Sequence, residues 1–263
     1  MALSAGSGPL GHHPAGHANY RIDGPAHRLY LEPSQRRLRA VVGDTVVADT
    51  VRPVLLHESG LLPVWYVPIG DLDPDFLVDS ATTTHCPFKG DARYWGLRVG
   101  ERQIDDAVWA YPEPLEGAPE VLADLAAIRF DAVDRWLEED LEVAGHPRDP
   151  YHRVETLPSS RRVVVHADLR ILADTTDAVA VFETSLAPRW YVPSDDVDTG
   201  ALHRSQTTTS CPYKGVATYY SLGELEGGED AVWAYTDPRP EAEAIRDLLC
   251  FDPDVVTVEV MDR

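Results

Sequence analysis

A nine-residue stretch that occurs twice carries the residues best suited to chemistry. Residues 82–90 read Thr-Thr-Thr-His-Cys-Pro-Phe-Lys-Gly, and residues 207–215 read Thr-Thr-Thr-Ser-Cys-Pro-Tyr-Lys-Gly. Lys89 and Lys214 are the only lysines of the chain. Arginine is a permanently charged fork, whereas lysine is a compact amine that burial can deprotonate. The pattern favours a point charge for an anionic ligand or an activated amine. The alternative is a structural lysine whose stem packs while its amine caps a carbonyl.

Two glutamates are the candidate partners of these lysines. Glu58 and Glu183 each follow a strand that reads as buried. A carboxylate at that position can act as a general acid or base, or it can form an ion pair with the lysine. Pairing would keep the amine charged, while a nucleophilic amine must be neutral. The sequence leaves both roles open.

Aromatic residues supply candidate walls for a pocket. In the pairs Trp65-Tyr66 and Trp190-Tyr191, neighbouring strand residues point to opposite faces, so one ring enters the core and the other lies elsewhere. An aromatic core is the alternative. We take Lys89, Glu58 and Tyr66 as catalytic candidates. The candidate ligand-binding residues are Trp109, Tyr94, Cys86, His57, Lys214, Glu183, Tyr191 and Trp233.

The cysteine of the repeated stretch is a weaker candidate. Cys86 could act as a nucleophile with His57 or His85 as its base, but phenylalanine and serine stand at those histidine positions in the second copy. The two copies therefore cannot share a Cys–His mechanism, and we expect buried, inert thiols. A thiol-dependent enzyme or redox sensor that uses Cys86 stays open as an alternative.

The repetition extends over a whole domain. Further segments recur at the same spacing, including Trp-Tyr-Val-Pro at residues 65–68 and 190–193. Each copy has about six short strands with turn residues between them, which indicates a mainly β fold of small antiparallel barrels or sandwiches. A Gly43-Asp44 turn predicts a hairpin. We expect one short helix per copy, from Pro119 and from Pro240, and a closing strand at about 133–143 and at 255–260.

The extent of the repeat predicts that the chain has three segments. Residues 1–25 are rich in Gly, Ala, Pro and His, which is typical of a flexible tail, with metal binding by its histidines as the alternative. The first repeat domain covers 26–146 and the second 147–263. We expect the two domains to pack as an intramolecular pseudo-dimer.

The repeated segments resemble the family known as domain of unknown function 427. The resemblance rests on Ala-Asp at 48–49, Glu58, Tyr-Val-Pro at 66–68, Cys-Pro-Phe-Lys-Gly at 86–90 and Ala-Val-Trp-Ala-Tyr at 107–111. It implies a β-tent-like barrel, similar to that of zinc-binding guanine-exchange-like proteins and methionine sulfoxide reductases. The paired zinc cysteines of those proteins are missing here. The resemblance implies no specific activity. The family carries a nucleotidyltransferase-like label, but the chain lacks a Gly-Ser followed by Asp-x-Asp and a Gly-rich phosphate loop.

The composition of the chain limits the kinds of molecule that it is expected to bind. The formal net charge of -21 disfavours binding to nucleic acid and to anionic membranes. No apolar run is long enough for a membrane span, and three unpaired cysteines suit a reducing cytoplasm. Single, distant cysteines and acidic loops without regular ligand spacing predict neither a metal site nor a cofactor.

The function expected from these observations is binding of a small polar or anionic metabolite beside the Cys-Pro-x-Lys-Gly turn, with or without lysine- and carboxylate-assisted chemistry. A non-catalytic interaction module is the rival. We expect the first copy to be the active one, because it adds His57, His85, Asp91 and Trp95, and the second copy to be mainly a scaffold.

Overall fold

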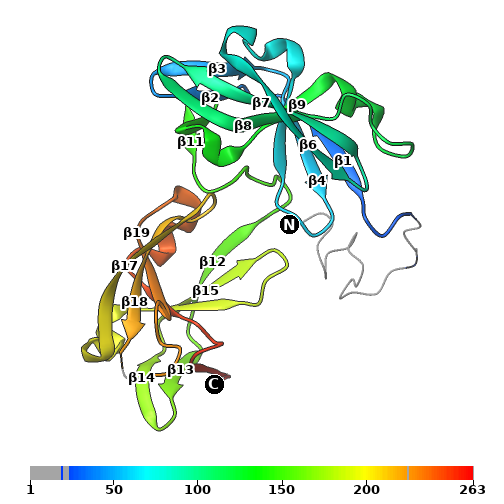
Figure 1. Cartoon of the computed structure of the whole chain (residues 1–263). Coiled ribbons are helices and arrows are strands. Elements are labelled where there is room, and N and C mark those ends of the chain that lie inside the picture. The colour runs from blue at the N-terminus through cyan, green and yellow to red at the C-terminus, as the bar shows by residue number, and fades with distance from the viewer. Residues whose placement is uncertain (1–18, 20–23, 224, 263) are drawn as a thin grey trace. The chain divides into compact units, whose positions relative to one another are not determined.

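The structure, a computed structural model, describes residues 19, 24–223 and 225–262. The tail predicted for residues 1–25 therefore lies outside the described residues except at 19, 24 and 25. The chain divides into two compact units, Met1–Asp149 and Pro150–Arg263, and antiparallel strands dominate each of them (Figure 1).

Two antiparallel sheets make up the first unit. Their strands are β1 (Leu29–Pro33), β2 (Leu38–Val42), β3 (Thr45–Thr50), β4 (Val54–Glu58), β5 (Val64–Pro68), β6 (Leu77–Cys86), β7 (Gly90–Val99), β8 (Arg102–Ala110), β9 (Leu125–Ile128), β10 (Arg135–Glu138) and β11 (Leu141–Val143). The larger sheet has the order β1-β4-β5-β9-β8-β7-β6 and the smaller one β11-β10-β2-β3. The predicted mainly antiparallel β class is confirmed, and both orders end in two different edge strands, so these are open sheets.

The second unit repeats this plan. Its strands are β12 (Val154–Ser159), β13 (Arg162–Ala167), β14 (Arg170–Thr175), β15 (Ala178–Glu183), β16 (Arg189–Val192), β17 (Leu202–Cys211), β18 (Gly215–Leu222), β19 (Val232–Pro238), β20 (Leu249–Phe251) and β21 (Thr257–Met261). The larger sheet has the order β12-β15-β16-β20-β19-β18-β17, and the smaller one β14-β13-β21. Strand for strand, the larger sheets of the two units have the same topology.

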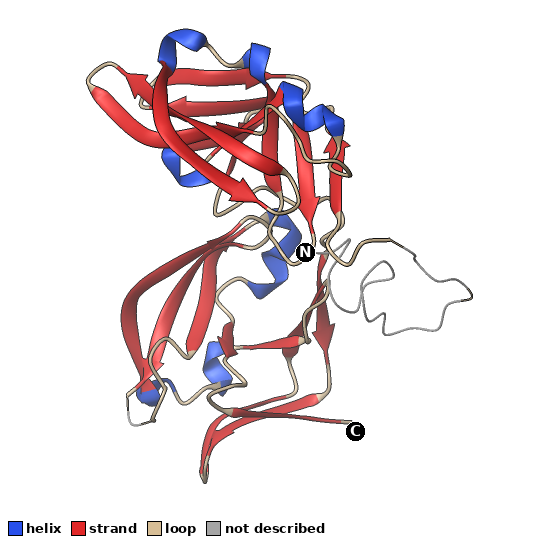
Figure 2. Cartoon of the chain, turned by 45° about the vertical axis from the view of Figure 1, so that its right-hand side comes forward, coloured by secondary structure: helices blue, strands red, loops and turns tan. Residues whose placement is uncertain are grey.

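Local sequence accounts for the turns and the short helices. The predicted hairpin at Gly43 is confirmed: Val42 pairs with Thr45, and Gly43 has φ 59, which glycine adopts without steric cost. The described helices are short 3₁₀ helices, blue in Figure 2: η1 (Ile69–Asp71), η2 (Pro74–Phe76), η3 (Glu120–Asp124), η4 (Phe130–Ala132), η5 (Ser194–Asp196), η6 (Thr199–Ala201) and η7 (Pro240–Ile245). The predicted helices correspond to η3 and η7. None of the described helices is both long and apolar enough to cross a membrane.

The larger sheet of each unit carries apolar side chains on both faces. In the first unit, Leu55 and Trp65 pack against the smaller sheet in the main core, while Leu56 and Tyr66 belong to a second cluster on the opposite face. This separation confirms the predicted alternation of Trp65 and Tyr66. We call the second side the aromatic face. Its rings are Tyr66, Tyr94, Trp109 and Tyr111 in the first unit, and Tyr191, Tyr219, Trp233 and Tyr235 in the second.

Candidate functional site

A histidine, a glutamate and a lysine meet in the first unit. Nε2 of His27 lies 2.8 Å from Oε1 of Glu58, and Nζ of Lys89 donates to Oε2 of the same carboxylate at 2.5 Å. Glu58 is 31 positions from His27 and 31 positions from Lys89 in sequence. The three residues come from the segment before β1, the end of β4, and the turn between β6 and β7. Each oxygen of Glu58 thus serves one nitrogen, and we call the arrangement the His–Glu–Lys row.

The second unit contains the same row at the same spacing. Nε2 of His152 lies 2.8 Å from Oε1 of Glu183, and Lys214 donates to Oε2 of Glu183. The glutamate and lysine side chains are about as buried as in the first unit, 10% and 13% exposed against 8% for both Glu58 and Lys89. Because this buried polar contact is repeated atom for atom, we infer that each position requires its residue type: histidine, glutamate or lysine.

Strand pairing and a side-chain clamp position the histidines. Leu29 pairs with Glu58 and Val154 with Glu183, so each histidine lies two residues before the strand residue opposite its glutamate. The next residue of the histidine segment is held as well: the backbone N–H of Arg28 donates to Oγ of Ser59 at 2.9 Å, and Arg153 makes the same bond to Thr184. The ring is therefore fixed beside the carboxylate.

A tight turn positions the lysine. The N–H of Lys89 donates to the carbonyl of Cys86 at 3.3 Å, and its own carbonyl accepts from Leu115 at 3.1 Å. Gly90 follows with φ 110, and a Cβ there would lie 3.0 Å from the carbonyl oxygen of Glu113. The invariant Lys-Gly order of the two copies thus has a backbone reason, because only glycine fits this conformation and this approach.

The Glu183 carboxylate is ionised. Burial raises its pKa, but the hydrogen bond from His152 and the charge and hydrogen bond of Lys214 outweigh burial and lower the pKa to about 2. An ionised carboxylate only accepts hydrogen bonds, so Nε2 of His152 carries the donated proton. In the neutral ring Nδ1 is then the basic nitrogen. This Nδ1 is buried and has no hydrogen-bond partner among the described residues.

Aromatic side chains adjoin the row. The indole N–H of Trp233 donates to the hydroxyl of Tyr191 at 3.0 Å. In the first unit Trp109 and Tyr66 are in edge contact, with ring centres 6.3 Å apart. Burial raises the pKa of both tyrosines, which therefore stay neutral phenols. Tyr66 is only 1% exposed, whereas Trp109 is half-buried. The tryptophan is therefore the ring that a ligand can reach, with the tyrosine beneath it.

The remaining candidate residues on the aromatic face of the first unit lie around the His–Glu–Lys row. The hydroxyl of Tyr94 is 2.9 Å from Oγ1 of Thr84, and Nζ of Lys89 lies 5.7 Å from the ring centre of Tyr111. Burial raises the pKa of Tyr111, which lies with Cys86 in the second cluster. Cys86 therefore packs among aromatic rings.

Several predicted residues are engaged elsewhere. His57 is the neighbour of Glu58 on β4, so it points to the opposite face, where Nε2 lies 3.0 Å from Glu32. His85 bonds Asp91 at 2.6 Å, on exposed strand positions. Trp95 packs against the main core. The structure thus brings neither candidate base to Cys86, and it gives the first copy no extra group in its row.

Sequence reasoning missed His27 and His152. Both lie outside the expected strands, in segments that read as a tail boundary and a linker. The signal that could have found them is spacing: Pro-Ala-His-Arg at 25–28 and Pro-Tyr-His-Arg at 150–153 keep the 125-residue offset of the repeat.

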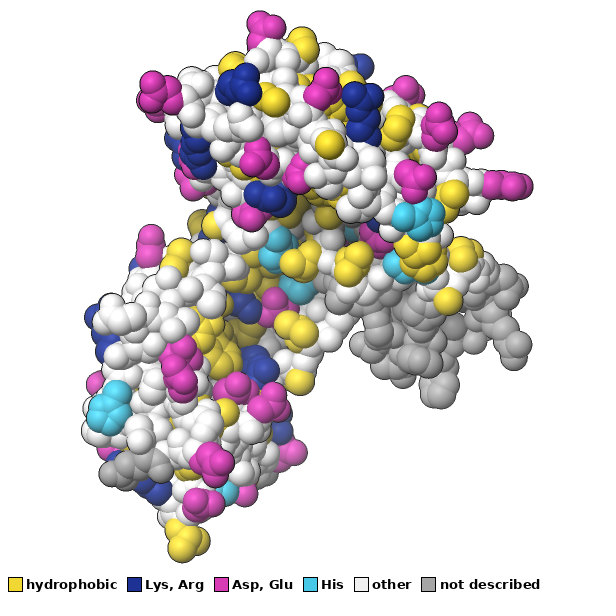
Figure 3. All heavy atoms as spheres, in the orientation of Figure 1, with side chains coloured by type: hydrophobic (Ala, Val, Ile, Leu, Met, Phe, Trp, Pro, Cys, Tyr) yellow, Lys and Arg dark blue, Asp and Glu magenta, His cyan; other side chains and the backbone are white. Residues whose placement is uncertain are grey.

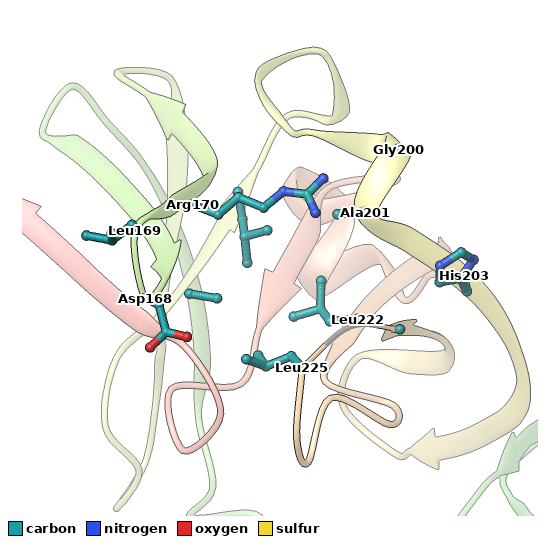
Figure 4. Close-up of a pocket in the computed structure, with 11 residues that line it drawn as sticks. Asp168, Leu169, Arg170, Gly200, Ala201, His203, Leu222 and Leu225 are labelled. Carbon is teal, nitrogen blue, oxygen red and sulfur yellow. The ribbon is translucent and has the colours of Figure 1, made fainter.

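A measurable cavity lies away from the row. It has a volume of about 440 Å³ and lies in the second unit between the β13–β14 hairpin and β17. Figure 4 shows Arg170 directed toward Ala201 across this cavity, while Leu169 points away from it. Arg170 is already paired with Asp198 at 2.7 Å. The walls are mostly aliphatic, and we assign no chemistry to them.

Comparison with known families identifies the repeat. Residues 30–139 and 155–262 each match the family described as a domain of unknown function, DUF427. The chain therefore belongs to this family and carries two tandem copies of its domain, which confirms the predicted duplication. A comparison with curated proteins gives no match. Among the described residues, no group of three His, Cys, Asp or Glu side chains could hold a metal ion.

Proposed function

We propose that this tandem member of the DUF427 family binds a small polar or anionic metabolite on the aromatic face of each unit, and that the His–Glu–Lys row transfers a proton to or from it. One observation carries the proposal: each glutamate shares its two oxygens between a histidine and a lysine, identically in both units. A carboxylate that fixes the tautomer of an imidazole is a common arrangement for a general base.

Each member of the row has a distinct role in this proposal. Glu58 orients His27 through Nε2, which leaves Nδ1 to exchange a proton with the ligand. Lys89 supplies a fixed positive charge beside the carboxylate. In this proposal the amine of Lys89 is a point charge paired with the carboxylate and does not act as a nucleophile. Trp109 and Tyr94 form walls, and Tyr66 holds Trp109 in position.

The second unit repeats these roles with its own residues, and because Nδ1 of His152 is buried, a ligand reaches it only when the side chains over it move. Glu183 orients His152, Lys214 is the fixed charge, and Tyr191 supports the wall formed by Trp233. We also propose a reducing cytoplasm as the location of the protein, which would keep Cys86, Cys211 and Cys250 as free thiols.

The test combines binding and conversion. The full chain is incubated with a panel of small polar and anionic metabolites, and binding and consumption are followed by NMR. In the double variant His27→Gln/His152→Gln, each glutamine keeps a donor for its glutamate but cannot take up a proton. We expect the variant to bind the wild-type ligand and to convert it at least about a hundredfold more slowly.

The control variant is His85→Gln, which changes an exposed histidine on a strand and should leave both readouts unchanged. Conversion by the double variant at the wild-type rate would refute proton transfer by the row. Absence of any bound metabolite with wild-type protein would refute the binding site itself.

A structural role without chemistry is the second candidate, and the burial of the Lys–Glu pair supports it. Breaking a buried ion pair destabilises a fold whether or not a ligand binds. Lys89→Arg keeps the charge but replaces a compact amine by a larger fork. Under the structural role, this variant would unfold earlier and the metabolite panel would give no ligand for wild type or variant.

A further inference from the structure

The two aromatic faces differ in charge at neighbouring positions, because Arg189 and Asp252 of the second unit stand where the first unit has Val64 and Arg129. Arg189 of β16 pairs with Val181 of β15, and in the first unit Val64 of β5 pairs with Leu56 of β4. Arg189 and Val64 are therefore equivalent positions. Directly paired residues share a face, and Glu183 lies two residues beyond Val181, so Arg189 lies on the same face as the row.

The guanidinium of Arg189 is incompletely satisfied. Its Cζ lies 5.8 Å from the ring centre of Trp233, and its Nη1 is buried without a hydrogen-bond partner in the described part of the chain. The nearest carboxylate is Asp252, with Oδ1 3.9 Å from Nη1, which is too long for a hydrogen bond. Buried donors are normally bonded, so an open arginine donor indicates a missing acceptor.

The surroundings of Arg189 fit an aromatic body. Trp233 and Tyr219 are both half-buried and have ring centres 6.3 Å apart. Figure 3 shows the second unit hollowed beside β12 and β15, with hydrophobic side chains in the hollow and Lys/Arg, Asp/Glu and His side chains along it. A ring that enters there would meet aromatic walls, and a charged substituent on it would meet cations.

The charges around Arg189 favour a ligand with one negative charge over a ligand with two. Arg189 is near Asp252, and Lys214 is already neutralised by Glu183. The whole chain carries a formal charge of -21. One arginine fork matches the two oxygens of a carboxylate, whereas a phosphate dianion would need a second uncommitted cation.

We propose that the second unit is selective for an aromatic carboxylate, whose carboxylate binds Arg189 and whose ring packs on Trp233. This inference rests on the proposed function, because it assigns a ligand class to the same face. It also reverses the expectation that the second copy is mainly a scaffold.

The experiment compares 4-fluorobenzoate with its neutral analogue 4-fluorobenzamide by fluorine NMR titration of the full chain. Wild type should bind the benzoate about tenfold more tightly than the amide, the size expected for a charged hydrogen bond. Arg189→Val, which installs the residue of the first unit, should remove this preference. Arg189→Lys should retain part of it.

Arg161→Val is the matched control. Arg161 also lies over a tryptophan, 5.4 Å from the ring centre of Trp190, but that ring packs against the main core of the second unit. Its replacement should leave the preference intact. Melting curves of all variants establish that they are folded.

Two results would overturn the inference: equal binding of benzoate and benzamide to wild type, including no binding of either, or unchanged benzoate affinity in folded Arg189→Val. Neither result bears on the proposed proton transfer, which is tested separately by the histidine variants and the metabolite panel.

Discussion

Nζ of Lys89 donates to Oε2 of Glu58 at 2.5 Å, and both side chains are 8% exposed. The two lysines of this chain are thus committed to two buried carboxylates. Such a pair contributes little net stability, because desolvation offsets the attraction, but each partner depends on the other. The pair fixes the position of the charge, and in the proposed function the histidine on the other oxygen transfers the proton.

Glu58→Gln should destabilise the first unit strongly. The variant leaves the Lys89 ammonium buried without its counter-charge, at a cost of about 3–5 kcal/mol. Urea denaturation followed by tryptophan fluorescence measures the loss. Asp49→Asn is the control, because Asp49 pairs with Arg37 at an exposed site and its loss should cost less than about 1 kcal/mol. Equal effects of the two variants would contradict the buried-pair argument.

Acid should destabilise the second unit through Glu183. The folded-state pKa of this carboxyl is about 2, below its ordinary value of 4.5. A depressed pKa gives stability that is present above pH 4.5 and is lost as the pH falls toward 2. The free energy of unfolding of Glu183→Gln should therefore vary less with pH than that of wild type in this window. Parallel curves for the two proteins would argue against an ionised Glu183.

The repeated pattern predicted much of the architecture. Duplicated segments, the hairpin at Gly43 and the opposite faces of Trp65 and Tyr66 all follow from local spacing, and each is present. The closing strand expected at 133–143 is instead split into β10 and β11, because Glu139 between them has φ 50. A single sequence does not reveal that a charged residue takes this turn conformation.

The site was predicted in part. Pairing of Glu58 with Lys89 was one of two interpretations of the sequence, and it is the contact observed. The histidines were missed because their contacts depend on the register of β1 with β4, and of β12 with β15, which no local pattern encodes. The equivalence of Arg189 in the second unit and Val64 in the first depends on register in the same way.

The bond from Trp233 to Tyr191 should show energetic coupling. Trp233→Phe leaves the buried hydroxyl of Tyr191 without its donor, at a cost of about 1–3 kcal/mol beyond the smaller ring. Tyr191→Phe in the same background removes the stranded hydroxyl and should recover part of the loss. A double-mutant cycle of unfolding free energies measures this coupling. Strictly additive effects would indicate that the hydrogen bond contributes nothing.

Gly90→Ala should disturb the turn that presents Lys89. Gly90 has φ 110, and an added Cβ would lie 3.0 Å from the carbonyl oxygen of Glu113. Backbone strain of this kind costs about 1–3 kcal/mol. The backbone must shift to relieve it, and Lys89 is the adjacent residue, so ligand binding at the first unit should weaken together with stability.

Gly70→Ala is the control for this change. Gly70 lies in η1, and an added Cβ there has no neighbour within 4 Å. Its replacement should be neutral or stabilise the fold by about 0.4–1 kcal/mol, through the lower entropy of the unfolded chain. Thermal melting of both variants, with the metabolite titration repeated on each, compares a glycine that positions the lysine with one that does not. If Gly90→Ala melted like Gly70→Ala and kept full ligand affinity, the turn would not be what holds Lys89 against Glu58.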